Sequence, residues 1–161
     1  MAIGRILHRL RSARAGDRVL RVRPKIFVGY EPESAAKWRQ RFGYDRRLPD
    51  LAVFCAAFAP TVLAADEAEA ETVVKLAYSW GSAAAFGHAL TVHASVSAVS
   101  LCCQITVWSR VGQRFLATRT FVGAPPPANI LSRPRQCRDE ILGEMPPLEP
   151  MVAFLERLRV E

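Results

Sequence analysis

Two carboxylates stand five residues apart in the stretch YDRRLPD, residues 44–50. Asp45 and Asp50 are the candidate catalytic residues, because one carboxylate can hold a proton for acid–base chemistry when a neighbouring negative charge raises its pKa. Two exposed loop acids without a catalytic role are the commoner arrangement. Asp50 also has a simpler role open to it, as the N-cap of the helix that we expect to begin at Leu51.

A basic stretch, KWRQRFGYDRR, surrounds the first of these acids at residues 37–47. Its cations are candidate ligands for phosphate groups: Lys37, Arg39, Arg41, Arg46 and Arg47. The aromatic residues between them leave two interpretations open, a nucleic-acid surface with stacked bases or a grip on the phosphates of coenzyme A or on an acidic carrier protein. Trp38 and Phe42 are four residues apart and share a helix face, which favours packing onto a sheet over base stacking.

The remaining reactive side chains indicate no further site. The four cysteines, Cys55, Cys102, Cys103 and Cys137, form no CxxC or Cys/His metal spacing, so we expect reduced thiols, an intracellular and cytoplasmic protein, and no metal. His88 and His93 are five residues apart in an expected strand and therefore point to opposite faces. Because no glycine-rich phosphate loop or Ser/His/Asp order is present, no cofactor is expected.

Charge is distributed unevenly along the 161 residues, whose net charge is +7. Residues 1–49 carry 13 Lys and Arg against 4 acids, whereas residues 50–100 carry 1 Lys against 5 acids. Residues 1–16 form a basic amphipathic segment that matches an organelle-targeting segment, a membrane-surface helix or a helix packed on the domain. The longest apolar run, residues 51–65, contains Pro60 and is too short to cross a membrane.

The order of expected elements indicates an α+β fold. Hydrophobic periodicity predicts helices over 31–43 and 51–65, the second one buried, and strands over 18–30, 72–80, 88–98, 99–109 and 115–123. The apolar alternation changes phase near Ser97–Ser100, which predicts a turn or bulge there and antiparallel pairing of the strands on either side. Residues 125–161 form a Pro-rich extension with helical stretches over 135–145 and 148–159, and Met151, Phe154 or Leu155, and Leu158 are placed to dock on the core.

This order resembles the hotdog fold of acyl-thioester enzymes, the thioesterases and MaoC-like hydratases or dehydratases. The residues that carry the resemblance are LPDLAVFCAAFAPTVLA as a central helix, followed by TVVKLAYSW, GHALTVHASV and SLCCQITVWSRVGQRFLATRTFV as the sheet. EPESAAKWRQRFGYDRRLPD looks like the MaoC-like lead-in to that helix. The resemblance implies one hotdog-like domain over residues 17–124, with an antiparallel sheet wrapped around a central apolar helix.

The resemblance also implies a function. It predicts a homo- or heterodimer that binds acyl-CoA or acyl carrier protein and acts as a hydratase, dehydratase or thioesterase. The chain lacks the histidine that these families place near the central helix, so a catalytically degenerate subunit is included in this expectation. The alternative, from another class, is a non-catalytic basic binding or scaffold module of a nucleic-acid or protein assembly.

Overall fold

The computed structural model describes residues 20–43, 46–83, 97–126 and 140–161. They form a mixed α+β fold in which a curled sheet has the strand order β2-β3-β4-β5, with β6 paired to β4. Its strands are β2 (Ile26–Tyr30), β3 (Thr72–Ser82), β4 (Ser97–Ser109), β5 (Arg114–Val122) and β6 (Glu140–Leu142). β2 runs parallel to β3 and β6 runs parallel to β4, whereas the other pairs are antiparallel. The α+β class expected from the sequence is therefore present.

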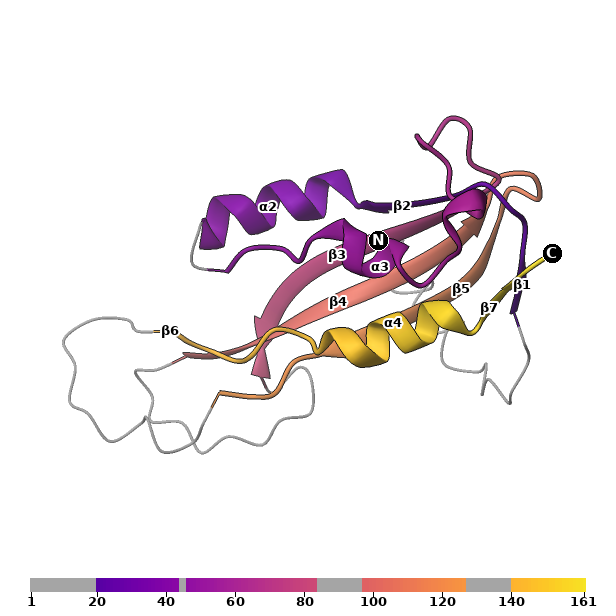
Figure 1. Cartoon of the computed structure of the whole chain (residues 1–161). Helices are drawn as coiled ribbons and strands as arrows, with labels where there is room; N and C mark the ends of the chain where they lie inside the picture. Colours follow the sequence, from indigo (N-terminus) through magenta and orange to yellow (C-terminus); the bar gives the residue numbers. More distant parts are fainter. Residues whose placement is uncertain (1–19, 44–45, 84–96, 127–139) are drawn as a thin grey trace, which may run out of the picture.

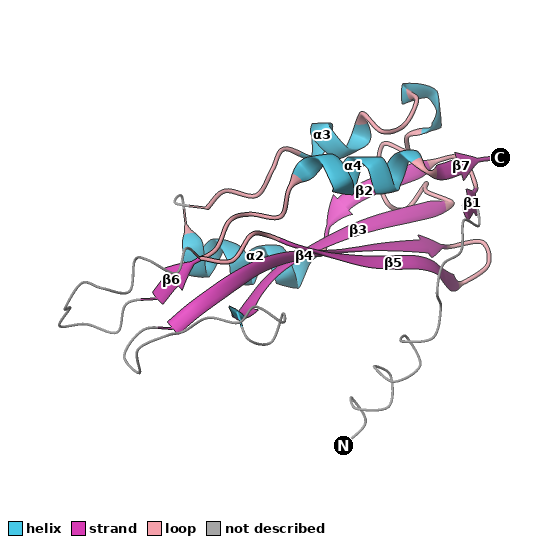
Figure 2. Cartoon of the chain, turned by 90° about the horizontal axis from the view of Figure 1, so that it is seen from below, coloured by secondary structure: helices cyan, strands magenta, loops and turns pink. Residues whose placement is uncertain are grey.

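The helices are α2 (Pro32–Phe42), α3 (Leu51–Cys55) and α4 (Leu148–Glu156). Figures 1 and 2 show α3 and α4 on one face of the sheet, while α2 lies beside β3 beyond the end of β2. α2 forms as its sequence predicts. Pro32 occupies its first turn, the side chain of Glu31 accepts hydrogen bonds from the amides of Glu33 and Ser34, and Gly43 follows its last residue with a positive φ of 52°.

The predicted strand over residues 18–30 is divided in two. Pro24 and Lys25, whose φ is 55°, separate β1 (Leu20–Val22) from β2. β1 leaves the main sheet and pairs in parallel with β7 (Leu158–Val160) at the other end of the chain. A left-handed conformation at a lysine interrupts an extended strand, so the alternation on either side could not continue through it.

The predicted central helix over residues 51–65 is much shorter than expected. α3 ends at Cys55, and after a turn the chain forms only a short 3-10 helix, η2 (Pro60–Val62). Proline disfavours a helical conformation at the residue before it and cannot donate a helical hydrogen bond. The sheet therefore does not wrap around a single long helix. Phe54 reaches the core from α3, and Phe58 reaches it from the bend that follows.

The expected reversal near Ser97–Ser100 is wrong, because β4 runs without a break from Ser97 to Ser109. β3 pairs with residues 99–109 along one edge of this strand, and β5 and β6 pair with residues along the other. A register shift does occur, but between Val107 and Trp108. Most of the predicted strand 88–98 lies outside the described residues.

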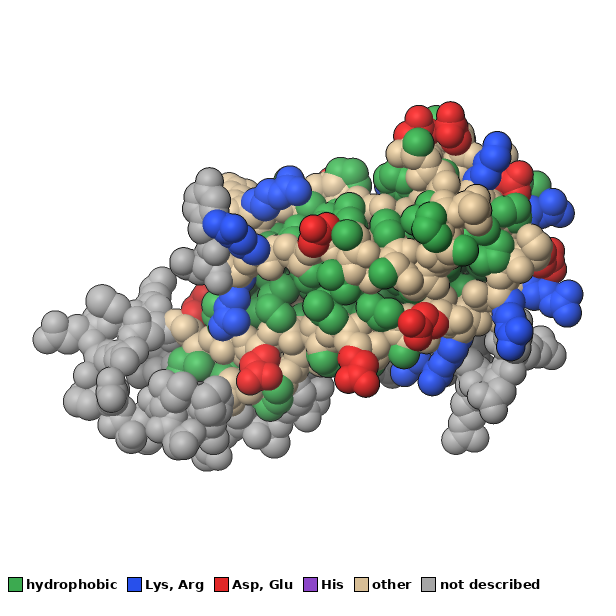
Figure 3. Space-filling view, viewed as in Figure 1, with side chains coloured by type: hydrophobic (Ala, Val, Ile, Leu, Met, Phe, Trp, Pro, Cys, Tyr) green, Lys and Arg blue, Asp and Glu red, His purple; other side chains and the backbone are tan. Residues whose placement is uncertain are grey.

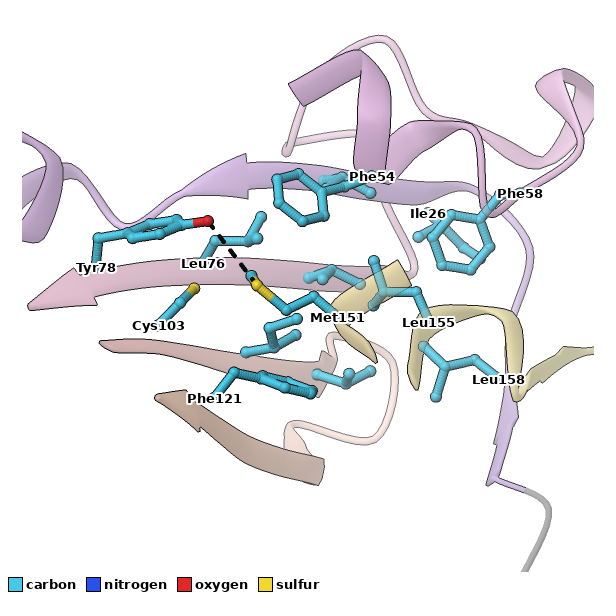
Figure 4. Close-up of a cluster of buried hydrophobic side chains, with 14 of the residues drawn as sticks. Ile26, Phe54, Phe58, Leu76, Tyr78, Cys103, Phe121, Met151, Leu155 and Leu158 are labelled. Atoms are coloured by element: carbon cyan, nitrogen blue, oxygen red, sulfur yellow. Dashed lines mark hydrogen bonds between the residues drawn. The ribbon is translucent and has the colours of Figure 1, made fainter. Parts of the chain in front are cut away.

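The C-terminal segment completes the core. Its described part contradicts the helix expected over 135–145, since residues 140–142 form β6. The helix expected over 148–159 is present as α4, which ends at Glu156 and is followed by β7. Met151, Leu155 and Leu158 are buried among Phe54, Leu76 and other core residues, as docking of this segment required (Figure 4). The layer that packs on the sheet is thus built by α3 and by the C-terminal helix α4, which are far apart in the sequence.

Candidate functional site

A band of apolar side chains lies on the helix-bearing face of the molecule (Figure 3). We call it the apolar strip. We include in it the half-buried apolar side chains of the segments that lie there: Leu48 before α3, Leu51 at the start of α3, Leu142 in β6, Met145 between β6 and α4, and Val152 in α4. These residues rest on the core but keep part of their surface accessible, so they form an apolar surface that a ligand can contact.

Two tyrosines contact the segments that contribute to the apolar strip. The hydroxyl of Tyr30 donates to the carbonyl oxygen of Pro49, and the hydroxyl of Tyr78 lies 4.0 Å from the sulfur of Met151. Their ring centroids are 6.1 Å apart in an edge-to-face arrangement. Burial raises the pKa of both hydroxyls well above the ordinary value of 10.0, so both stay protonated at neutral pH. They can donate hydrogen bonds but cannot serve as bases.

Asp50 is the N-cap of α3. Its carboxylate accepts a hydrogen bond of 2.9 Å from the backbone amide of Ala52, and the side chain is exposed. This is the structural role that the sequence left open for it. Asp45 lies outside the described residues, so the structure does not place the two candidate catalytic carboxylates relative to each other.

The predicted phosphate-binding cations occupy different environments. Lys37, Arg39 and Arg47 are exposed, while Arg46 is half-buried. Arg41 forms an ion pair with Glu140 of β6, and its guanidinium lies 5.0 Å from the ring centroid of Trp80. The negative charge of Glu140 offsets the positive charge of Arg41. Sequence reasoning missed Glu140, because no local pattern connects residues that are 99 positions apart.

The aromatic residues of the basic stretch point inward. Trp38 is 0% exposed and Phe42 is also buried, and Trp38 packs edge-to-face on Tyr78 and Trp80. The indole nitrogen of Trp38 donates a 2.7 Å hydrogen bond to the carbonyl oxygen of Arg46, which anchors the following loop. Packing of this helix face onto the sheet is thereby confirmed. These two rings are not available for base stacking.

The described cysteines carry no nucleophilic or metal site. Cys102 lies 3.0 Å from the hydroxyl of Ser79, and both Cys102 and Cys103 are buried. Burial raises the pKa of both thiols, that of Cys103 to about 12, so neither is a thiolate at neutral pH. Among the residues that the structure describes, no group of three metal-ligating side chains occurs. His88, His93 and Cys137 lie outside them.

The opposite face of the sheet carries an aromatic row that sequence reasoning did not identify. The register places Phe27, Val73, Trp108 and Phe115 side by side across four strands. The rings of Trp108 and Phe115 meet edge-to-face at 4.6 Å, and Phe115 is 72% exposed. The register shift at Val107 and Trp108 brings Phe115 to this face, so strand alternation alone could not have placed it.

Comparison of the chain with protein-family models, curated proteins and solved structures gives no match. Within the described ranges, none of the helices has the length and apolar character needed to cross a membrane.

Proposed function

We propose that this protein binds acyl thioesters, with the acyl chain lying along the apolar strip. The observation that carries the proposal is the apolar band on the helix-bearing face (Figure 3), to which we assign the half-buried residues Leu48, Leu51, Leu142, Met145 and Val152. An extended alkyl chain that covers half-exposed side chains gains free energy in proportion to the apolar area removed from water. The sequence resemblance to hotdog proteins indicates the same class of ligand, although α3 is much shorter than the central helix of that fold. We extend the proposal to a partner chain, a second copy or a related subunit, that covers the bound acyl chain.

The head of the ligand is assigned to the basic residues near the strip. The ion pair between Arg41 and Glu140 joins α2 to β6, so the C-terminal end of α2 adjoins the segment that borders the strip. Lys37 and Arg39 are exposed on the same helix and can contact phosphate groups of coenzyme A or the acidic surface of a carrier protein. Coenzyme A and an acidic carrier protein would both place negative charge at the C-terminal end of α2.

We propose binding without turnover as the principal activity. Asp50 caps a helix, and the tyrosines beneath the strip are neutral donors, so neither provides a ready base. The catalytic alternative is hydration, dehydration or thioester hydrolysis. This alternative requires Asp45 and Asp50 to act together. Detection of a reaction product distinguishes catalysis from binding without turnover.

Calorimetry with a series of saturated and trans-2-enoyl-CoAs, followed by mass spectrometry of the mixtures, tests the proposal. Affinity should rise roughly fourfold for each CH₂ that becomes buried. Met145→Asp should abolish this dependence on chain length, whereas Val111→Asp, the same kind of change at an exposed turn, should leave it intact. Affinity that is equal for free CoA and every acyl-CoA would overturn the proposal. Hydrated enoyl-CoA or released CoA that disappears in Asp50→Asn would establish the catalytic form.

A second candidate function is a basic binding module for nucleic acid, favoured by the exposed Lys37 and Arg39 and the net charge of +7. With Trp38 and Phe42 buried, such an interface would consist of phosphate contacts. Its affinity should therefore fall steeply with salt and depend little on base sequence. Binding of this kind that is lost in the Lys37→Gln, Arg39→Gln double variant, without affinity for acyl-CoA, would favour this candidate.

A further inference from the structure

A cavity of about 230 Å³ lies between α4 and β5, apart from the residues that border the apolar strip. One lining residue comes from β5, and the others come from α4 and from Arg157, the residue that follows it: Arg119, Glu149, Pro150, Ala153, Phe154 and Arg157. Cavities that enclose a drug-sized ligand are larger, in the range of about 300–1,000 Å³. This one is suited to a single chemical group rather than a whole ligand.

The guanidinium of Arg119 is held in this cavity by two aromatic rings. It lies 5.2 Å from the ring centroid of Phe121 and 5.9 Å from that of Phe154. The two rings are 6.0 Å apart in an edge-to-face arrangement and thus form a corner against which the guanidinium packs. Stacking on ring faces orients an arginine while leaving the N–H donors at its edge free.

Neither arginine of the cavity is neutralised by a carboxylate. No acidic side chain in the described ranges comes within 4.0 Å of Arg119 or Arg157, although Arg21, Arg41 and Lys75 each have an acidic partner. Glu149 lines the same cavity but makes no ion pair with either arginine. The cavity is therefore lined by two arginines without an ion-pair partner and by one glutamate.

We propose that this cavity binds a phosphate monoester group. A carboxylate is matched by one guanidinium fork, whereas the oxygens of a phosphate can accept hydrogen bonds from two arginines at once. Glu149 disfavours a second anionic group and accepts a hydrogen bond from a hydroxyl or amine beside the phosphate. The site therefore selects a single phosphate with a neighbouring donor over a pyrophosphate. This inference does not depend on the apolar strip.

The test follows the side-chain Nε–H signals of the arginines by NMR while the full chain is titrated with inorganic phosphate and with O-phosphoethanolamine. The signals of Arg119 and Arg157 should shift with saturation, and Arg119→Gln should weaken binding at least tenfold. Arg119→Lys should also weaken it, because a lysine keeps the charge but loses the fork. The matched control is Arg114→Gln, which removes an exposed arginine of the same strand outside the cavity and should bind normally.

Two further measurements make the test specific. Glu149→Gln should raise the affinity for inorganic phosphate and reduce the preference for O-phosphoethanolamine over it. Vesicles that contain phosphatidic acid test whether the phosphate belongs to a lipid headgroup. If the protein binds these vesicles and Arg119→Gln abolishes that binding, the phosphate is assigned to a lipid headgroup. Non-saturating shifts of equal size at every arginine, Arg114 included, would overturn the proposal. Loss of acyl-CoA binding in Met145→Asp with phosphate binding retained would keep the two sites distinct.

Discussion

The hydroxyl of Tyr78 lies 4.0 Å from the sulfur of Met151, and this contact joins the middle of β3 to α4. Both side chains are almost fully buried, and they belong to segments 73 residues apart. The C-terminal helix is therefore a structural part of the core that lies on the sheet (Figure 4). The same two residues lie directly beneath the proposed acyl-binding surface.

Met151→Ala should lower the free energy of unfolding by about 2–5 kcal/mol, because it removes a fully buried side chain and leaves a cavity between α4 and the sheet. Met151→Leu should cost less than about 1.5 kcal/mol, since it conserves volume. Urea denaturation measures both. Val111→Ala is the control, because Val111 is 61% exposed and should change stability by at most about 0.5 kcal/mol. A cost for Met151→Ala as small as that of the control would contradict the observed packing.

Asp50→Ala should cost about 1 kcal/mol of stability, because the amide of Ala52 loses its side-chain acceptor. Asp50→Asn should cost much less, since asparagine caps a helix about as well as aspartate. The comparison by urea denaturation separates a capping role from a catalytic one. Equal stability of Asp50→Ala and the unmodified protein would argue against the cap.

The protein should lose stability as the pH rises from about 9 towards 12, partly because of Cys103. Burial raises the pKa of this thiol to about 12 in the folded protein, against 9.0 in the unfolded chain. Above pH 9 the unfolded chain releases this proton while the folded protein retains it, so unfolding is favoured by up to about 1.4 kcal/mol per pH unit for this group. The raised pKa values of Tyr30 and Tyr78 act in the same direction at higher pH.

Cys103→Ala should therefore make the decline less steep, whatever its effect at neutral pH. Urea denaturation at a series of pH values measures the slope. Val107→Ala is a matched control on the same strand, because it removes buried apolar volume without removing a titrating group. An unchanged slope in Cys103→Ala would show that the thiol does not titrate as its burial requires.

Phe115→Ser should cost no more than about 1.5 kcal/mol, because Phe115 is 72% exposed and its ring contact with Trp108 is the main interaction lost. Phe54→Ala, at a fully buried position, should cost about 3–5 kcal/mol. Chemical denaturation of the two variants under identical conditions provides the measurement. A large cost for Phe115→Ser would mean that this face is covered in solution.

Local sequence signals were sufficient for elements whose ends and faces depend on neighbouring residues. Pro32 and Gly43 set the limits of α2, and the spacing of Trp38 and Phe42 indicated its buried face. Alternation in TVVKLAYSW likewise predicted the strand β3, in which the alternate residues Val74, Leu76 and Tyr78 are buried. These features follow from helical and strand geometry alone, so the sequence predicts them.

The same signals failed where a single residue interrupts a favourable pattern. The apolar run of residues 51–65 has no polar face to indicate its length, and the structure contains only α3 and η2 there, on either side of a turn and separated from each other before Pro60. At the candidate site, Asp50 was recognisable as a cap because aspartate before a helix start is a local signal. Glu140 was not recognisable as the partner of Arg41.

The sequence by itself determined the α+β class, the position of α2 and β3, and the basic character of the surface on α2. Only the tertiary structure decided that β1 pairs with β7, that α4 enters the core and that Arg119 packs against Phe121 and Phe154. The physical reason is that helix and strand periodicity arise from interactions between residues a few positions apart. The pairing of distant segments depends instead on which apolar surfaces and charges can be satisfied together when the whole chain is compact.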